Sequence, residues 1–96
     1  MKNIKNINQQ AIEIQRRFFE AIELAKTLER TSGIKEFCIT HNLNRTKYYR
    51  VKSLLNKPPT EMHYKSIDID ALHYLCRDFG VSPTWLLLGK GELKIR

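Results

Sequence analysis

The segment HNLNRTKYYRVKS, residues 41–53, concentrates side chains that can bind a polyanion. It carries four cations and two adjacent tyrosines, and no acid lies between Glu36 and Glu61. Five cations fall within this acid-free interval: Arg45, Lys47, Arg50, Lys52 and Lys57. By contrast, residues 1–35 carry seven cations and four acids, and residues 62–96 carry five and four. Because an acid would repel phosphate, the unbalanced segment predicts contact with a polyanion such as nucleic acid.

Apolar residues that recur at three- and four-residue steps predict helices through most of the chain. The predicted helices span residues 9 to about 30, 34–41, 45 to about 55, 69–79 and 83–88. No strand, repeat or low-complexity block is recognisable, so the sequence predicts an all-α fold, a compact bundle of about five helices. One domain, residues 9–91, is expected between a flexible polar arm at 1–8 and a tail at 92–96.

The expected helix boundaries depend on residues that suit helix ends. Potential N-caps precede the predicted helices: Asn8, Ser32 or Gly33, Asn44, Asp68 and Ser82. Asn42 and Gly80 tolerate the left-handed conformation and therefore suit helix exits. Pro58 and Pro59 exclude helix from the long loop between the third and fourth predicted helices.

The second and third predicted helices are joined by the short turn THNLN, residues 40–44, which is the spacing of a helix-turn-helix. In such a unit the second helix can enter a major groove about 12 Å wide and present its N-terminal residues to base edges. Three residues of this helix are expected to face the core: Tyr48, Val51 and Leu55. The positions that then face outward or sideways are Arg45, Thr46, Tyr49 and Arg50.

These outward residues have chemistry suited to DNA. Arg45 and Arg50 can pair bidentately with guanine O6 and N7. Thr46 can bond a base or a phosphate or touch a thymine methyl, and Tyr49 can bond phosphate or lie against sugar and base. Three lysines are expected to meet phosphates, which position a protein without specifying sequence: Lys47, Lys52 and Lys57. The Asn44 side chain can either cap the helix or read adenine, and the sequence leaves both open.

Together these features resemble the λ-repressor-like helix-turn-helix family (Cro/C1-type, XRE-like) over residues 18–91. The motif FCITHNLNRTKYYRVK matches the family's small residue in the first helix of the unit, its turn glycine and the apolar residue that follows: Cys38, Asn42 and Leu43. Tyr48 and Val51 match its buried positions in the recognition helix. The closing segment FGVSPTWLLLGKG, residues 79–91, matches an aliphatic-Gly-Val turn, Trp-Leu-Leu and Gly-x-Gly, and this second match is the more specific.

The resemblance implies a sequence-specific double-stranded DNA-binding protein, a bacterial or phage-type transcriptional repressor without cofactor, catalysis or small-molecule substrate. Carried over by position, the family's base-reading sites fall on Asn44, Arg45, Thr46, Tyr49 and Arg50. A homodimer on a two-fold operator is expected. Its interface candidates are Phe19, Leu87 and Leu88. The family's glutamine at the start of helix two is matched by Ile34 or its neighbours, so that contact is absent or passes to Ser32 or Lys35.

Other functional classes remain open on the residues alone. Cys38-x-x-His41 and His73-x-x-Cys76 have zinc-like spacing, although both cysteines fall on predicted core faces. Cys38 with a histidine could also supply a thiol nucleophile, but no orienting acid is visible, so no enzyme is expected. The main alternative is a protein-interaction module that uses the adjacent tyrosines and the leucines at 86–88. RNA binding is a third hypothesis, ranked below DNA binding and protein interaction.

Composition bounds the cellular setting. The net charge of +7 favours nucleic acid first and an anionic membrane surface second. The longest apolar run, residues 85–88, is far shorter than the roughly 18 residues that a membrane span needs. The N-terminus lacks the apolar core of a signal peptide, and the two cysteines do not form a disulfide framework, so a cytoplasmic protein is expected. The arm residues 2–5 either follow phosphates or a minor groove, or are disordered.

Overall fold

The computed structural model describes residues 8–57 and 66–96, which form five helices and no strand. The helices are α1 (Gln9–Thr27), α2 (Ile34–Thr40), α3 (Arg45–Leu54), α4 (Ile69–Phe79) and α5 (Pro83–Leu88). The predicted all-α fold of five helices is therefore confirmed. The first helix ends at Thr27, earlier than the predicted end near Arg30. Most of the predicted arm and the predicted Pro58-Pro59 loop lie outside the described residues.

Short polar side chains begin three of the helices as expected. The Asn8 side chain accepts a hydrogen bond from the Ala11 N–H at 2.8 Å, and Ser82 Oγ accepts one from the Trp85 N–H at 3.3 Å. Asn44 does the same for α3, as described below. Asp68 occupies the N-cap position of α4, but its side chain makes no capping bond. Gly80 ends α4 with a φ of 70°, the left-handed conformation predicted for it.

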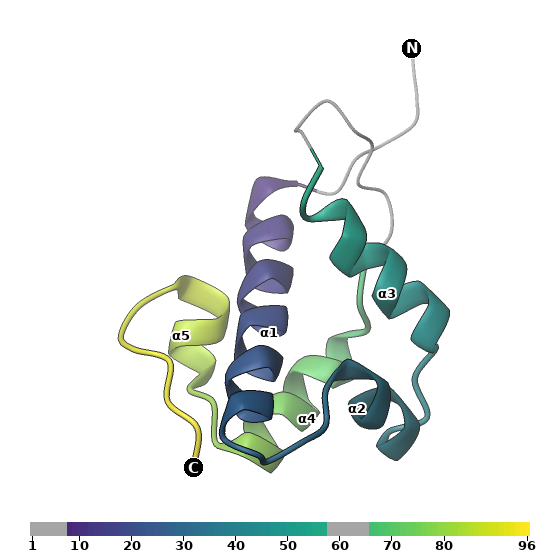
Figure 1. Cartoon of the computed structure of the whole chain (residues 1–96). Coiled ribbons are helices and arrows are strands. Elements are labelled where there is room, and N and C mark those ends of the chain that lie inside the picture. Colours follow the sequence, from purple (N-terminus) through teal and green to yellow (C-terminus); the bar gives the residue numbers. More distant parts are fainter. Residues whose placement is uncertain (1–7, 58–65) are drawn as a thin grey trace.

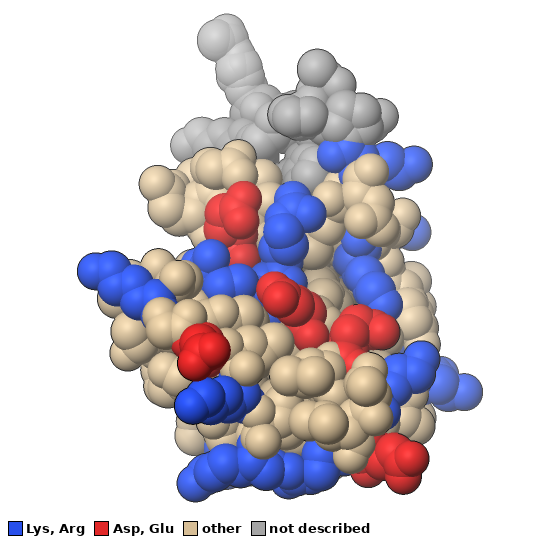
Figure 2. Space-filling model, turned by 60° about the vertical axis from the view of Figure 1, so that its left-hand side comes forward, with Lys and Arg blue, Asp and Glu red and all other residues tan. Residues whose placement is uncertain are grey.

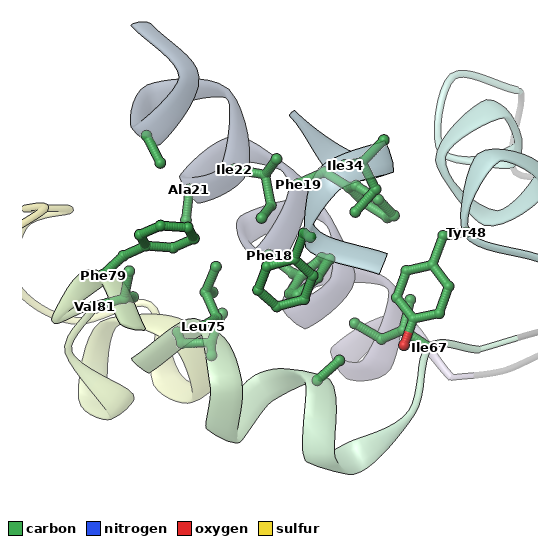
Figure 3. Packing of buried hydrophobic residues seen from close by; sticks show 14 of the residues in the cluster. Phe18, Phe19, Ala21, Ile22, Ile34, Tyr48, Ile67, Leu75, Phe79 and Val81 are labelled. Carbon is green, nitrogen blue, oxygen red and sulfur yellow. The ribbon is translucent and has the colours of Figure 1, made fainter. Parts of the chain in front are cut away.

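Helix α1 is the centre of the molecule (Figure 1). It packs against α4 and α5, while α2 packs against α3 on the opposite side of α1 from α5. Aromatic and aliphatic residues from all five helices fill the space between them, and Phe18 of α1 lies in the middle of this core, fully buried (Figure 3). The Phe18 ring makes edge-to-face contacts with Phe19 and Phe37 and lies 6.1 Å from the Tyr48 ring.

Predicted core positions on α1 and α4 differ from the structure. Leu28 falls three residues after Ala25, in the apolar stripe that the sequence pattern predicts for the first helix, but it is half exposed because the helix ends at Thr27. On α4, the sequence pattern predicts a buried face of Leu72, Leu75, Cys76 and Phe79. The structure instead buries Ala71 fully beside Leu75 and Phe79, and leaves Leu72 and Cys76 only partly buried. Helix α4 therefore turns a smaller residue toward α1 than the apolar pattern indicated.

The C-terminal segment packs against the domain. Leu93 and Ile95 are partly buried against the core, and the Arg96 N–H donates to the Phe79 carbonyl at 2.8 Å. The Arg96 side chain lies so close to Gly80 that a Cβ at that position would collide with it. Residues 92–96, predicted as a tail, thus cover the end of α4.

Candidate nucleic-acid interface

The connection between α2 and α3 sets the position of the candidate recognition helix. Asn42 adopts a φ of 56°, which is the left-handed exit predicted for it. The Leu43 N–H then donates to the Cys38 carbonyl at 2.8 Å, which turns the chain back toward α2. Asn44 Oδ1 accepts a hydrogen bond from the Lys47 N–H at 3.0 Å. The capping role of Asn44 is therefore observed, and its oxygen is already engaged at the start of α3.

The inner face of α3 is anchored in the core as predicted, because Tyr48, Val51 and Leu55 are all buried. The Tyr48 ring reaches from α3 toward the segment that carries Ile67 (Figure 3). There its hydroxyl donates to Asp68 Oδ2 at 2.7 Å and accepts from the Asp68 N–H at 3.1 Å. Burial raises the pKa of the Tyr48 hydroxyl, so it remains protonated and able to donate.

A buried glutamine of α1 holds the segment that carries Asp68, the hydrogen-bond partner of Tyr48. Gln15 of α1 is 3% exposed, and its Oε1 accepts a hydrogen bond from the Ile67 N–H at 2.7 Å. Ile67 and Asp68 are therefore tied to α1 and α3 before α4 begins. The hydrogen bond from Tyr48 is the largest cause of the lowered pKa of Asp68, and together with Lys47 it outweighs the opposing effect of burial.

The outer face of α3 presents the residues that the sequence assigned to DNA. Arg45, Thr46, Tyr49 and Arg50 are all exposed, with Tyr49 at 47%. Lys57 is exposed just beyond the helix. Within residues 8–57 and 66–96, the cations Arg45, Arg50 and Lys57 form no ion pair. These side chains can therefore meet phosphate or base edges without first breaking a described salt bridge.

Two of the predicted phosphate-binding lysines have partners within the protein. Lys47 Nζ lies 3.0 Å from Asp68 Oδ1, and Lys52 Nζ lies 3.2 Å from Glu23 Oε2 of α1. All four side chains are between 32% and 52% exposed. Half-exposed pairs of this kind contribute only about 0–1 kcal/mol each to stability. The sequence did not reveal these contacts.

The start of α2 differs in charge from α3. Glu36 Oε1 accepts hydrogen bonds from the Ser32 N–H at 2.6 Å and from Thr31 Oγ1 at 2.8 Å. The Ser32 backbone bond is the main reason that the pKa of Glu36 lies below 4.5. Lys35 is exposed beside it. Ser32 and Lys35, the two residues that the sequence offered in place of the family's glutamine contact, are both exposed.

Cys38 of α2 and His41, which directly follows this helix, belong to packing contacts. Cys38 is 1% exposed, and burial raises its pKa to about 11. His41 Nε2 lies 2.7 Å from Asp78 Oδ2, and its ring stacks on Tyr74 with centroids 4.0 Å apart. Among the residues that the structure describes, no group of three or more potential ligands is placed to hold a metal ion. The Cys38 thiol has neither the exposure nor the low pKa of a nucleophile.

Helix α5 carries the exposed apolar residues that the sequence proposed for a partner. Leu87 is 45% exposed and Leu88 is 66% exposed, whereas Phe19 is buried in the core and is not available on this surface. Arg17 of α1 donates from Nε to the Leu86 carbonyl at 2.7 Å and from Nη2 to the Leu87 carbonyl at 3.2 Å. These bonds hold the end of α5 against α1 and leave two leucines facing outward.

Charge is distributed differently on the other side of the molecule. In Figure 2 the α5 side has been turned forward, and acidic and basic side chains are interspersed over it. Compared with this mixed surface, helix α3, whose sequence contains no acid, is the better candidate for binding a polyanion.

No helix among the described residues has the length and apolar character needed to cross a membrane.

Comparison with known proteins adds no relative to this picture. Neither a scan of protein-family models nor searches of curated proteins and of solved structures give a match for this chain. The resemblance to the λ-repressor-like family therefore stays a prediction that depends on the residues quoted above.

Proposed function

We propose that this chain is a transcriptional regulator, a repressor of the λ-repressor-like helix-turn-helix type, that binds double-stranded DNA through the outer face of α3. The observation that carries the proposal is the exposed face formed by Arg45, Thr46, Tyr49 and Arg50 on a helix whose own sequence contains no acid. Its opposite face is buried through Tyr48, and three hydrogen bonds at Asp68 tie the helix to the segment before α4. A helix anchored on one side, with two accessible arginines on the other, suits direct reading of a major groove.

Roles follow from where each side chain lies. Arg45 and Arg50 are assigned to guanine edges or phosphates, and Thr46 and Tyr49 to adjacent base or backbone positions. Lys57 is assigned to a phosphate. The Asn44 oxygen accepts the capping bond from the Lys47 N–H, and the amide nitrogen of that residue, which the cap does not use, is assigned to DNA.

A homodimer on a two-fold operator is part of the same proposal, with Leu87 and Leu88 at the interface. Support comes from the exposure of both leucines on a six-residue helix whose other apolar residues, Trp85 and Leu86, are buried. Replacing Leu88 by Glu is expected to shift the protein toward monomer in sedimentation equilibrium. It is also expected to weaken binding to a two-fold site more than binding to random duplex.

The test of the main proposal is fluorescence anisotropy with random duplex DNA at two salt concentrations. We expect salt-sensitive binding by the wild-type protein, because counterions are released when cations meet phosphates. Arg50→Ala is expected to weaken binding to random duplex, and to weaken binding to a selected site by about 1–3 kcal/mol if Arg50 pairs with a guanine there. Lys90→Ala is the control, because Lys90 is an exposed cation two residues after the end of α5, and α5 lies on the far side of α1 from α3.

The alternative of a protein-interaction module has its own support and its own outcome. Tyr49, Leu87 and Leu88 are exposed and could face a protein partner, whereas Tyr48 and Leu86 are buried and could not. Absence of duplex binding even at low salt would reject the DNA proposal and favour this alternative.

A further inference from the structure

Two carboxylates from outside α3 contact lysines of α3. Glu23 Oε2 of α1 lies 3.2 Å from Lys52 Nζ, and Asp68 Oδ1, just before α4, lies 3.0 Å from Lys47 Nζ. Along the sequence these acids lie 29 and 21 residues from their lysines. The fold thus brings negative charge to a helix whose own sequence contains none.

The two contacts compete chemically with DNA. A carboxylate and a phosphate oxygen are both anionic acceptors, and a lysine ammonium is a compact point charge that binds either. The two carboxylates also lie within reach of the helix that would face phosphates, where their charge opposes that of DNA. The two carboxylates differ in their other contacts. Asp68 is also held by the Tyr48 hydroxyl, whereas Glu23 is more exposed than its partner Lys52.

We propose that Glu23 and Asp68 withhold Lys52 and Lys47 from the DNA backbone, so that these two lysines do not count among the phosphate contacts of the complex. This inference rests on the proposed DNA binding and specifies how its strength is limited. The contact surface then consists of Arg45, Arg50 and Lys57 with Thr46 and Tyr49. The two acids act as built-in competitors that lower both the affinity for duplex and its salt dependence.

Glu23→Gln is the variant that tests the proposal most cleanly. Glu23 is exposed and makes only this one described ion pair, so its loss leaves the core intact. Glu20→Gln is the matched control, because Glu20 is an exposed acid of the same helix with no described ion pair. Both changes raise the net charge by one. A general effect of charge would therefore appear in both variants.

The readout is the slope of log affinity against log salt for random duplex DNA. Each added phosphate contact steepens this slope by about 0.9. We expect the slope to be steeper by about 0.9 in Glu23→Gln than in the wild type, and to be unchanged in Glu20→Gln. The advantage of Glu23→Gln over the wild type should then fall about 3.5-fold between 50 mM and 200 mM salt, as a slope change of about 0.9 requires.

Lysine variants complete the cycle. Lys52→Gln and Lys47→Gln should leave the wild-type slope unchanged, because neither lysine contacts phosphate while its carboxylate is present. In the Glu23→Gln background, Lys52→Gln should return the slope of log affinity against log salt to its wild-type value, which removes the increase of about 0.9. Circular dichroism of each variant verifies that it is folded.

The outcomes separate this inference from the function on which it rests. Equal slopes for the wild type, Glu20→Gln and Glu23→Gln would overturn the inference while DNA binding stands. A slope that drops with Lys52→Gln alone would overturn it too, because Lys52 would then contact phosphate despite Glu23. If no variant binds duplex at low salt, the proposed function and the inference both fail.

Discussion

The hydroxyl of Tyr48 offers a sharp test of how α3 is held in place. Tyr48→Phe removes one oxygen and keeps a ring that fills the same fully buried space. The lost oxygen donates to Asp68 Oδ2 at 2.7 Å and accepts from the Asp68 N–H at 3.1 Å. The change therefore isolates two hydrogen bonds between α3 and the segment before α4, with little effect on packing.

The expected cost follows from those two bonds. A hydrogen bond to a charged group contributes about 1.5–3 kcal/mol, and a backbone N–H left without a partner costs about 1–3 kcal/mol. Asp68 is partly exposed, so water can replace some of the loss. We expect the free energy of unfolding to fall by about 2–4 kcal/mol, a large share of the roughly 5–15 kcal/mol typical of a domain. The melting temperature should drop by at least about 8 °C.

Urea unfolding followed by fluorescence of the single tryptophan measures this change. Trp85 is buried in α5, far along the chain from Tyr48, so it reports global unfolding. Tyr49→Phe is the matched control, since Tyr49 is the next residue, loses the same oxygen and is 47% exposed. Its stability should stay within about 0.5 kcal/mol of the wild type. A Tyr48→Phe protein as stable as this control would refute the anchoring role of the Asp68 contact.

The same variant has a pH signature whose sign is fixed by Asp68. The bond from Tyr48 is the main cause that holds the pKa of Asp68 below 3.8 in the folded protein. A pKa lowered by folding contributes stability that is complete above the unfolded pKa and is lost as pH falls through the folded pKa. The stability gap between wild type and Tyr48→Phe should therefore be constant near neutral pH and narrow below about pH 3.8. A gap that widens in acid would contradict this assignment.

Three further experiments test other parts of the fold. Gly80→Ala should cost about 1–2 kcal/mol in urea unfolding from backbone strain alone, because φ is 70° there. In the Gly80→Ala background, Arg96→Ala should remove the collision with Cγ and Nε of Arg96, but it leaves the 2.9 Å approach to the Cβ of residue 96 and the backbone strain. Arg17→Ala should lower the free energy of unfolding by about 1–3 kcal/mol through two lost bonds to carbonyls of α5; an unchanged melting curve would contradict this. In iodoacetamide labelling of native protein at pH 8, Cys76 should react before Cys38, whose pKa is about 11; equal rates would count against the buried position of Cys38.

Local features of the fold could be predicted because they depend on residues close together in sequence. Asn44 and Ser82 cap their helices as expected, and Pro83 begins α5 at the predicted residue. Asn42 and Gly80 adopt the left-handed conformation at the two predicted helix exits. The inward positions of α3 follow from helical periodicity alone. Each of these predictions concerns a hydrogen bond or a backbone angle within about four residues.

Tertiary contacts of polar side chains could not be predicted in the same way. Asp68 is well suited to cap α4, and it occupies that position, yet its carboxylate contacts Tyr48 and Lys47 instead. Nothing in the sequence near Gln15 predicts that its amide oxygen accepts a hydrogen bond from the buried Ile67 N–H. Such partners depend on how α1, α3 and the segment before α4 meet, and no periodicity in the sequence specifies that arrangement.

Charge near α3 shows why this distinction matters for function. The stretch from Glu36 to Glu61 has no acid in sequence, which led all five of its cations to be assigned to DNA. Packing of α3 against the domain places Glu23 and Asp68 beside two of them. Coulombic energy depends on distance in space, so a helix without acids in its own sequence can still have carboxylates on the surface around it. The contacts that anchor α3 are thus also expected to limit its charge, and the salt dependence of DNA binding measures the cations that remain.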